Sequence, residues 1–222
     1  AKDFLNPLEA LIPFYKQGKR FKIVTNAGGL NPKGLAESCL KMLSGMGLKV
    51  GIVNGDDVLQ DILENSKEDY FRNIDTNISL KSHQRELKTA NAYVGSFGIS
   101  EALKQGADIV ITGRVADPCL VVGPCMYSFG WNSNEYDKIA KATVAGHLIE
   151  CGRQVTGGIN SFWEELSDVD TMGFPIVEVE SDGSFVVTKP SNSGGEVSLR
   201  TVKEQLLYEI GDPTAYLSPD VT

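Results

Sequence analysis

The chain has 222 residues, 41% of them hydrophobic, and a net charge of −8 at pH 7 with an isoelectric point near 4.9. This length is sufficient to bury a hydrophobic core. The negative charge argues against duplex nucleic acid and anionic membrane surfaces as partners, because both bind basic proteins. No apolar run approaches the roughly 20 residues of a membrane-spanning helix. We therefore expect a soluble protein whose partner is a small-molecule substrate.

Cysteine usage and the opening residues indicate a cytoplasmic protein. The four cysteines are scattered without Cys-x-x-Cys spacing, which is typical of reduced, buried thiols rather than of a disulfide framework; they are Cys39, Cys119, Cys125 and Cys151. The first residues contain no basic-then-apolar secretory leader, so the chain reads as a processed or excised piece of a longer polypeptide.

Helices and strands are expected to alternate in the first half of the chain. Short β-branched segments predict strands, and apolar residues at helical spacing predict helices between them. The expected elements are a helix from Asn6-Pro7 to about Gly18 that Pro13 kinks or shortens, a strand over 21–25, a helix from Pro32 to about Gly45, a strand over 49–54 and a helix after Gly55. Such alternation is the signature of a parallel sheet covered by helices.

The second half of the chain first repeats the alternation of helices and strands and then contains an antiparallel hairpin. An irregular excursion over 66–90 is expected to precede a short helix over 101–105, a buried strand over 107–112 and a long helix over 137–151. Two alternating segments flank Asp182-Gly183, a strong hairpin signal, and a last helix carries Val202, Leu206 and Ile210. We predict one α/β domain over residues 1–222: a mainly parallel sheet covered by helices on both faces, with an appended antiparallel hairpin.

Ligands of open α/β sheets collect at the loops that follow the strands. After the first strand come Asn26, Gly28, Gly29 and Asn31, whose amides and side chains can hold a carboxylate, a phosphate or a thioester oxygen. The spacing from Gly29 resembles a phosphate loop, but Leu35-Ala36 stands where Lys and Ser or Thr are required. A tight strand-to-helix turn is the alternative interpretation.

The loops after the next two strands carry charged residues. In Gly55-Asp56-Asp57 an acidic residue is expected to cap the following helix, and the alternative is a metal or hydroxyl ligand. In the loop after the third strand, Thr112, Gly113 and Arg114 can bind a substrate anion, with a structural pair between Arg114 and Asp117 as the alternative.

His147, Glu150 and Cys151 share one face of the long helix, because they lie three and four residues apart. His147, Glu150 and Asp117 are the candidate proton-transfer groups, while Cys151 is either a nucleophile or a packed thiol. Further candidate binding residues are Asn91, Thr156, Gly157, Gly158, Lys189, Ser193, Gly194 and Gly195. The motifs identify no metal site and no cofactor, and two histidines in the whole chain do not build a zinc site.

Several ordered motifs together resemble one family. They include Val24-Thr25-Asn26-Ala27-Gly28-Gly29, Ile111-Thr112-Gly113-Arg114-Val115-Ala116-Asp117-Pro118, and the segments 91–95, 145–152, 156–158, 173–176, 188–190 and 204–213. This chain is similar to the acyclic terpene utilisation (AtuA) family over nearly its whole length. The resemblance implies that the chain is an internal part of a longer domain.

The resemblance also implies a role in the catabolism of acyclic terpenoids or branched acids through coenzyme A thioesters, alongside carboxylase and hydratase partners. A homo-oligomer is the alternative assembly. The hypothesis is an enzyme that performs a hydration, lyase or hydrolytic step on an acyl-CoA or related carboxylate. The alternative is a non-catalytic ligand-binding or assembly subunit. A third hypothesis, a purely structural scaffold, predicts that no small molecule raises the melting temperature.

Overall fold

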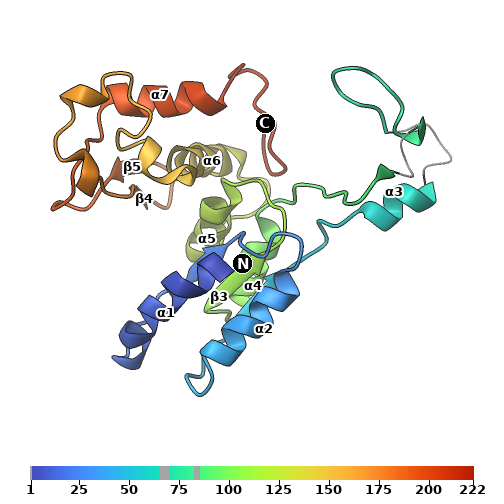
Figure 1. Cartoon of the computed structure of the whole chain (residues 1–222), viewed down its shortest axis with the longest axis horizontal. Helices are drawn as coiled ribbons and strands as arrows, with labels where there is room; N and C mark the ends of the chain where they lie inside the picture. The colour runs from blue at the N-terminus through green and yellow to red at the C-terminus, as the bar shows by residue number, and fades with distance from the viewer. Residues whose placement is uncertain (1, 66–70, 83–85) are drawn as a thin grey trace.

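The centre of the fold is a three-stranded parallel sheet (Figure 1). A computed structural model describes residues 2–65, 71–82 and 86–222. Strand β3 lies between the other two, and Thr25 pairs with Ile111 while Val53 pairs with Thr112. The strands are β1 (Ile23–Thr25), β2 (Val50–Val53) and β3 (Ile109–Thr112). Because the three strands are parallel and in close register, their carboxyl ends meet at one edge.

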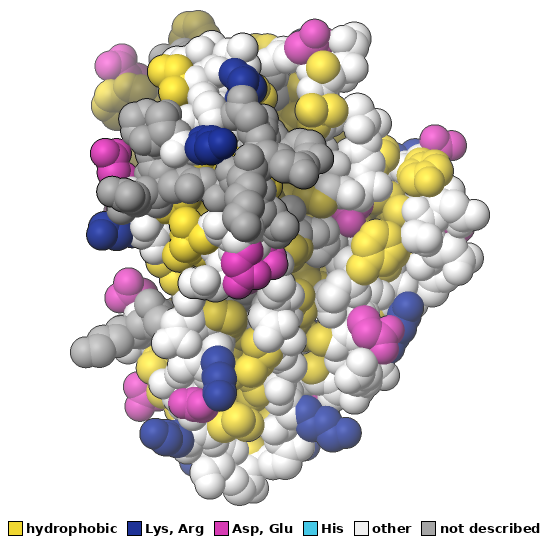
Figure 2. Space-filling view, turned by 90° about the vertical axis from the view of Figure 1, so that its right-hand side faces the viewer, with side chains coloured by type: hydrophobic (Ala, Val, Ile, Leu, Met, Phe, Trp, Pro, Cys, Tyr) yellow, Lys and Arg dark blue, Asp and Glu magenta, His cyan; other side chains and the backbone are white. Residues whose placement is uncertain are grey.

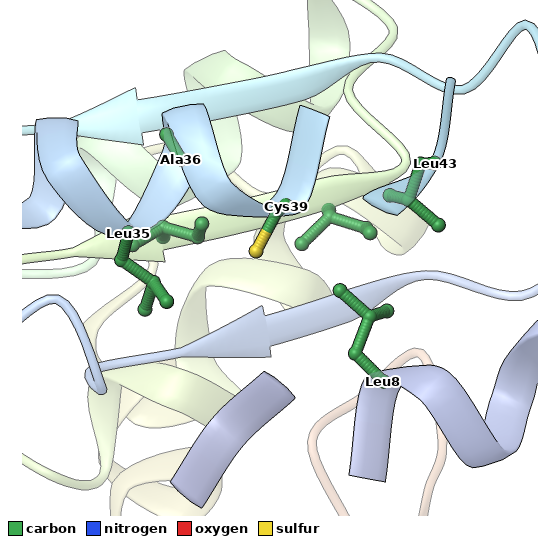
Figure 3. Close-up of a cluster of buried hydrophobic side chains, with 7 residues drawn as sticks. Leu8, Leu35, Ala36, Cys39 and Leu43 are labelled. Carbon is green, nitrogen blue, oxygen red and sulfur yellow. The ribbon is translucent and has the colours of Figure 1, made fainter. Parts of the chain in front are cut away.

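Helices cover both faces of this sheet, so the predicted α/β class is confirmed. Ile109 and Ile111 of β3 pack with α1 (Lys2–Lys16) and α2 (Pro32–Met42) in the cluster drawn in Figure 3. Val110 points to the opposite face and packs with α4 (Phe97–Lys104) and the start of α5 (Cys119–Phe129). Every side chain of β3 is buried, as expected for the central strand of a sheet covered on both faces.

The predicted hairpin is confirmed, and it forms a separate two-stranded sheet. Strands β4 (Ile176–Val179) and β5 (Phe185–Thr188) pair antiparallel around Asp182-Gly183, where Gly183 has φ +83°. The hairpin packs on α6 (Tyr136–Glu150), which also contacts α5 and α7 (Leu199–Glu209). Short 3-10 helices connect these elements over Gly152–Gln154, Trp163–Glu165 and Val169–Thr171.

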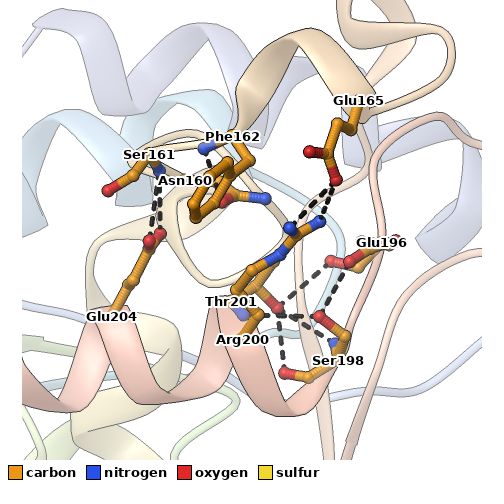
Figure 4. Close-up of polar contacts among 9 residues, drawn as sticks. All are labelled: Asn160, Ser161, Phe162, Glu165, Glu196, Ser198, Arg200, Thr201 and Glu204. Carbon is orange, nitrogen blue, oxygen red and sulfur yellow. Dashed lines mark hydrogen bonds and ion pairs between the residues drawn. The ribbon is translucent and has the colours of Figure 1, made fainter.

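Polar contacts fix the first half of α7 (Figure 4). Ser198 and Thr201 form a reciprocal capping box at its start. Arg200 forms a 3.0 Å ion pair with Glu165, and the Glu204 carboxylate accepts hydrogen bonds of 3.1 and 3.2 Å from the Ser161 amide. Because α7 is held against α6, Glu209 at its last position comes close to the end of α6.

Two helices differ from the sequence-based expectation. Helix α1 begins at Lys2 and continues through Pro7 and Pro13, because burial of Leu8 and Tyr15 on one face offsets the backbone hydrogen bonds that proline cannot donate. Helix α4 begins at Phe97, four residues before the predicted start.

Helix α5 was not predicted at all. Its residues are almost uniformly apolar, so they show no amphipathic period, and the segment contains both Gly123 and Pro124. The helix nevertheless forms between α4 and α6. A Cβ atom at Gly123 would lie 2.6 Å from Ile99, so glycine is what permits the close contact with α4.

The predicted excursion over 66–90 is described in part. Residues 66–70 and 83–85 lie outside the described residues. The remainder contains an antiparallel bridge between Arg72 and Ser79 and a 3-10 turn over Leu80–Ser82, and it follows α3 (Leu59–Asn65) on one side of the sheet (Figure 1).

The surface charges and the lengths of the helices can be compared with the expectation that neither nucleic acid nor a membrane is a partner. On the face shown in Figure 2, Lys and Arg side chains are scattered among acidic and apolar ones. Among the described helices, none combines the length and apolar character that crossing a bilayer requires.

The core around α2 yields a stability prediction. Replacing Leu35 by Ala should lower the free energy of unfolding by about 2–5 kcal/mol, because the buried side chain leaves a cavity against β3. Leu40 on the same helix is half exposed, and its replacement by Ala should change the free energy by less than about 0.5 kcal/mol. Urea unfolding measures both, and equal losses for the two variants would contradict this core assignment.

Candidate functional site

The loops that follow the three strands meet at the carboxyl edge of the sheet. The loops after β1 and β2 line a cavity of about 350 Å³, together with Lys88, Thr89 and Asn91. Gly29, Asn31 and Asp56, all from these two loops, face this cavity. The structure therefore brings Asn91 to the same edge as the loops after β1 and β2.

Asp56 holds the loops after β2 and β3 together. Its side chain is buried, and its carboxylate accepts hydrogen bonds of 2.9 Å from Asn91 Nδ2 and from the Arg114 amide. A Cβ atom at Gly113 would lie 2.2 Å from Asp56 Oδ1, so glycine is required there. The capping interpretation of this motif applies to the next residue, because Asp57 accepts from the Leu59 amide at the start of α3.

The loop after β1 is a tight turn packed against β3. A Cβ atom at Gly28 would lie 2.3 Å from Thr112 O, and Gly29 has φ +51° with its amide donating to Asn26 O. Asn31 caps α2 by accepting from the Gly34 amide at 2.9 Å. The turn interpretation therefore accounts for both glycines and for Asn31.

The side chains of Asn26 and Arg114 are not part of that turn and contact the residues Asp117 and Tyr93, respectively. Asn26 Nδ2 donates to Asp117 Oδ1 at 2.8 Å, so Asp117 is held by an amide and not by Arg114. The exposed Arg114 guanidinium instead lies 5.0 Å from the Tyr93 ring centroid and donates to the Tyr93 hydroxyl. An arginine stacked on an aromatic ring keeps its charge available for an anion. Thr112 is buried, and its hydroxyl donates to Gly113 O.

A second group of polar side chains gathers where α6 ends. His147 Nδ1 lies 3.7 Å from Glu150 Oε1 and 3.1 Å from the hydroxyl of Tyr216, which follows α7. Cys151 Sγ lies 3.6 Å from Glu209 Oε1. We call His147, Glu150, Cys151, Glu209 and Tyr216 the acidic cluster. The predicted pair His147 and Glu150 therefore lies side by side.

The charges in the acidic cluster favour a protonated carboxyl group. Burial is the largest cause that raises the pKa of Glu150, and together with the negative charges of Asp117 and Glu209 and a hydrogen bond with Glu209 it brings this pKa from 4.5 to about 7. Asp117, at the end of the loop after β3, is thus near enough to act on Glu150. A carboxyl group with a pKa near neutral can both donate and accept a proton at physiological pH.

His147 is neutral in this environment. Burial lowers its pKa, and the opposing attraction of Glu209 is the smaller effect. Within the described residues Nε2 is buried and has no hydrogen-bond partner. A buried N–H without an acceptor is costly, so the favoured tautomer carries its proton on Nδ1 and donates it to the Tyr216 oxygen.

Cys151 is a thiol rather than a thiolate. Burial raises its pKa, and the charges of Glu150 and Glu209 act in the same direction, which weakens the thiol as a nucleophile. The donor atoms of Glu150, Cys151 and Glu209 lie within 4.8 Å of one another. Carboxylate and thiolate donors suit zinc, so these three residues could hold a metal.

The remaining predicted binding residues pack against each other. The Thr156 hydroxyl donates to Gly173 O at 2.7 Å, and Lys189 Nζ donates to Ser193 O at 2.6 Å. A Cβ atom at Gly195 would lie 2.4 Å from Thr156 O. The close approach of Gly195 to Thr156 brings the loops 156–158 and 193–195 together. In the described part of the chain no hydrogen bond links these loops to Glu150 or Asp56. Gly157, Gly158 and Gly194 lie within the same two loops.

Sequence reasoning missed Glu209 and Tyr216. One signal was present for Glu209: it falls on the face of α7 that carries Val202 and Leu206, where an acidic residue is unexpected on a helix that packs against another. Tyr216 lies outside any helix or strand, so no periodicity marks it.

Comparison with known proteins gives one match. The model of a protein family described as "Acyclic terpene utilisation family protein AtuA" matches residues 1–222. No curated protein and no solved structure matches the chain. The family match spans both the strand-end loops and the acidic cluster.

The raised pKa of Glu150 predicts a pH-dependent stability. Between pH 4.5 and 7 the folded protein retains a proton on Glu150 that the unfolded chain releases, so this stabilising contribution is lost as the pH rises through that window. Wild type should lose up to roughly 3 kcal/mol relative to Glu150→Gln between pH 4.5 and 8. Urea unfolding across this range measures the difference. Glu164→Gln, at an exposed position, should follow wild type, and parallel curves for wild type and Glu150→Gln would refute the assignment.

Proposed function

The chain belongs to the acyclic terpene utilisation (AtuA) family, and from this premise we propose that it is an acid–base enzyme of acyclic terpene utilisation. Its substrate is a branched acyl-CoA thioester or a related carboxylate, and its reaction is a hydration, lyase or hydrolytic step. The observation that carries this proposal is Glu150, a carboxyl group with a pKa of about 7 beside a neutral imidazole.

The distribution of charge supports a substrate with an anionic part and a neutral reacting part. The acidic cluster and Asp117 repel a carboxylate or a phosphate, so the group that reacts beside Glu150 is neutral, such as a thioester or an alkene conjugated with it. Arg114 belongs to the same loop as Asp117 and its guanidinium stacks on the Tyr93 ring. It provides a positive charge for the anionic part of the substrate.

Two carboxyl groups near one another suit addition or removal of water, because one can accept a proton while the other donates one. In the hydration direction the Asp117 carboxylate takes a proton from water as the water oxygen bonds to the β-carbon of the conjugated thioester. The Glu150 carboxyl group donates its proton to the α-carbon, so one water molecule is added overall. Removal of water is the reverse, and Asn26 holds Asp117 in place through its 2.8 Å hydrogen bond.

The role of Glu150 predicts a loss of turnover without a loss of binding. Glu150→Gln should lower kcat by about 10²–10⁴-fold, because the amide cannot exchange a proton. Substrates to assay are branched acyl-CoA thioesters, saturated and α,β-unsaturated, with product formation followed by mass spectrometry. Glu164→Gln is the control and should retain wild-type kcat. Wild-type turnover in Glu150→Gln would exclude Glu150 as the proton-transfer group.

The role of Arg114 predicts a loss of binding. Arg114→Ala should weaken acyl-CoA binding by about 10–100-fold, whereas Arg114→Lys should retain part of the affinity, because the charge remains and the two-pronged geometry is lost. Calorimetric titration measures both. A thioester of N-acetylcysteamine, which lacks the phosphates, should bind wild type and Arg114→Ala equally; unchanged acyl-CoA affinity in Arg114→Ala would remove this residue from the site.

The same binding and turnover experiments distinguish the proposed enzyme from the alternative, a non-catalytic ligand-binding or assembly subunit. A non-catalytic subunit would bind the thioester with wild-type affinity and yield no product until a partner enzyme is added. Mass spectrometry of the ligand that co-purifies with the protein identifies the compound to test first.

A further inference from the structure

The segment that follows α7 crosses back over the acidic cluster. Residues 210–222 form no helix or strand, and they run from the end of α7 toward the loop after β3. The Tyr216 ring packs edge-on against the His147 ring with 5.6 Å between centroids, and its hydroxyl lies 3.1 Å from Nδ1. Tyr216 therefore covers the imidazole of the proposed site.

Asp220 fastens this segment to the body of the protein. Its two carboxylate oxygens accept hydrogen bonds of 3.1 and 3.0 Å from the Ser96 amide, and Oδ2 lies 3.3 Å from Cys119 Sγ. A Cβ atom at Gly95 would lie 2.2 Å from Asp220 Oδ1, so the sequence leaves room for this carboxylate.

Asp220 also places a carboxylate at the start of α4, a helix that has no side-chain cap. Ser96 is the residue before α4, yet its hydroxyl donates to Met126 Sδ and makes no capping hydrogen bond to the helix. The carboxylate of Asp220 accepts from the Ser96 amide at the start of α4, where a negative charge is favoured. The side chain of Asp220 thus attaches the segment 210–222 to the start of α4. Val221 adds partial packing against α5.

His147 and Glu150, below this segment, have little exposure to solvent. The His147 side chain is 1% exposed and that of Glu150 is 12% exposed. A substrate cannot reach groups with so little exposure unless a covering segment moves. Residues 210–222 cover His147 directly, and apart from Asp220 and Tyr216 their described side-chain hydrogen bonds lie within the segment itself, such as those of Thr214 with Asp212 and of Ser218 with Val221.

We propose that residues 210–222 are a gate over His147 and Glu150, that Asp220 holds the gate closed at the Ser96 amide, and that release of Asp220 moves Tyr216 off His147. The importance of the gate for catalysis rests on the proposed function. The gate itself is tested without a substrate, so its failure and the failure of the proposed function are distinguishable.

The test measures access to His147 with diethyl pyrocarbonate, a reagent that modifies imidazoles, and locates the modification by peptide mass spectrometry. Asp220→Ala should raise the rate of His147 modification by on the order of tenfold, as expected for local opening. Tyr216→Ala removes the cover directly and should raise it at least as much. Asp212→Ala is the matched control, because Asp212 lies in the same segment and, among the described residues, its side chain accepts hydrogen bonds only from Thr214.

Two buried cysteines distinguish gate opening from general unfolding. Cys39 is a buried residue of α2 and Cys125 is a buried residue of α5, so alkylation of either with N-ethylmaleimide reports loss of the core. The proposal predicts wild-type alkylation of both cysteines in Asp220→Ala. It is overturned if His147 modification in Asp220→Ala equals that of wild type, or if it rises only in parallel with alkylation of Cys39 and Cys125.

Discussion

The position of every group in the proposed site depends on the buried strand β3 and the loop that follows it. β3 is bonded to a parallel strand on each side and all its side chains are buried, so its end is fixed. The following loop is then held by Asp56 at the Arg114 amide and by Asn26 at Asp117. These contacts set Arg114 and Asp117 at the carboxyl edge of the sheet.

The same loop determines where α6 lies. A Cβ atom at Gly146 would lie 2.7 Å from Pro118, so only a glycine allows the helix to approach the loop this closely. His147 and Glu150 follow Gly146 on α6 and thereby come near Asp117. The acidic cluster is therefore a consequence of one close contact between a helix and the loop after the central strand.

Gathering carboxyl groups in a half-buried place is unfavourable, because burial and like charges both oppose ionisation. Glu150 responds by retaining a proton at a pH where an ordinary glutamate has lost it. Proteins keep such an arrangement mainly where it serves a function, and perturbed carboxyl groups are common in catalytic sites. Here the groups that raise the pKa, Asp117 and Glu209, come from two different parts of the chain and converge on the end of α6.

Local patterns predicted the parts of this arrangement that depend on neighbouring residues. The strands, the loops after them, the hairpin at Asp182-Gly183 and the adjacency of His147 and Glu150 all follow from periodicity or from helical spacing. Contacts between distant segments did not follow. Glu209 lies 58 residues from Cys151 in sequence and Tyr216 lies 69 residues from His147, and their approach depends on how α7 packs. Helix α5 escaped prediction because a uniformly apolar helix has no amphipathic pattern to detect.

The most direct test of the account is the titration of Glu150 itself. Carbon-13 NMR of the glutamate side-chain carboxyl groups follows each protonation separately, and the resonance of Glu150 is the one absent from Glu150→Gln. We predict a midpoint near pH 7 for this resonance and a lower midpoint in Glu209→Gln, which removes one neighbouring charge but leaves the burial and Asp117 in place. A midpoint near 4.5 in the wild-type protein would contradict it.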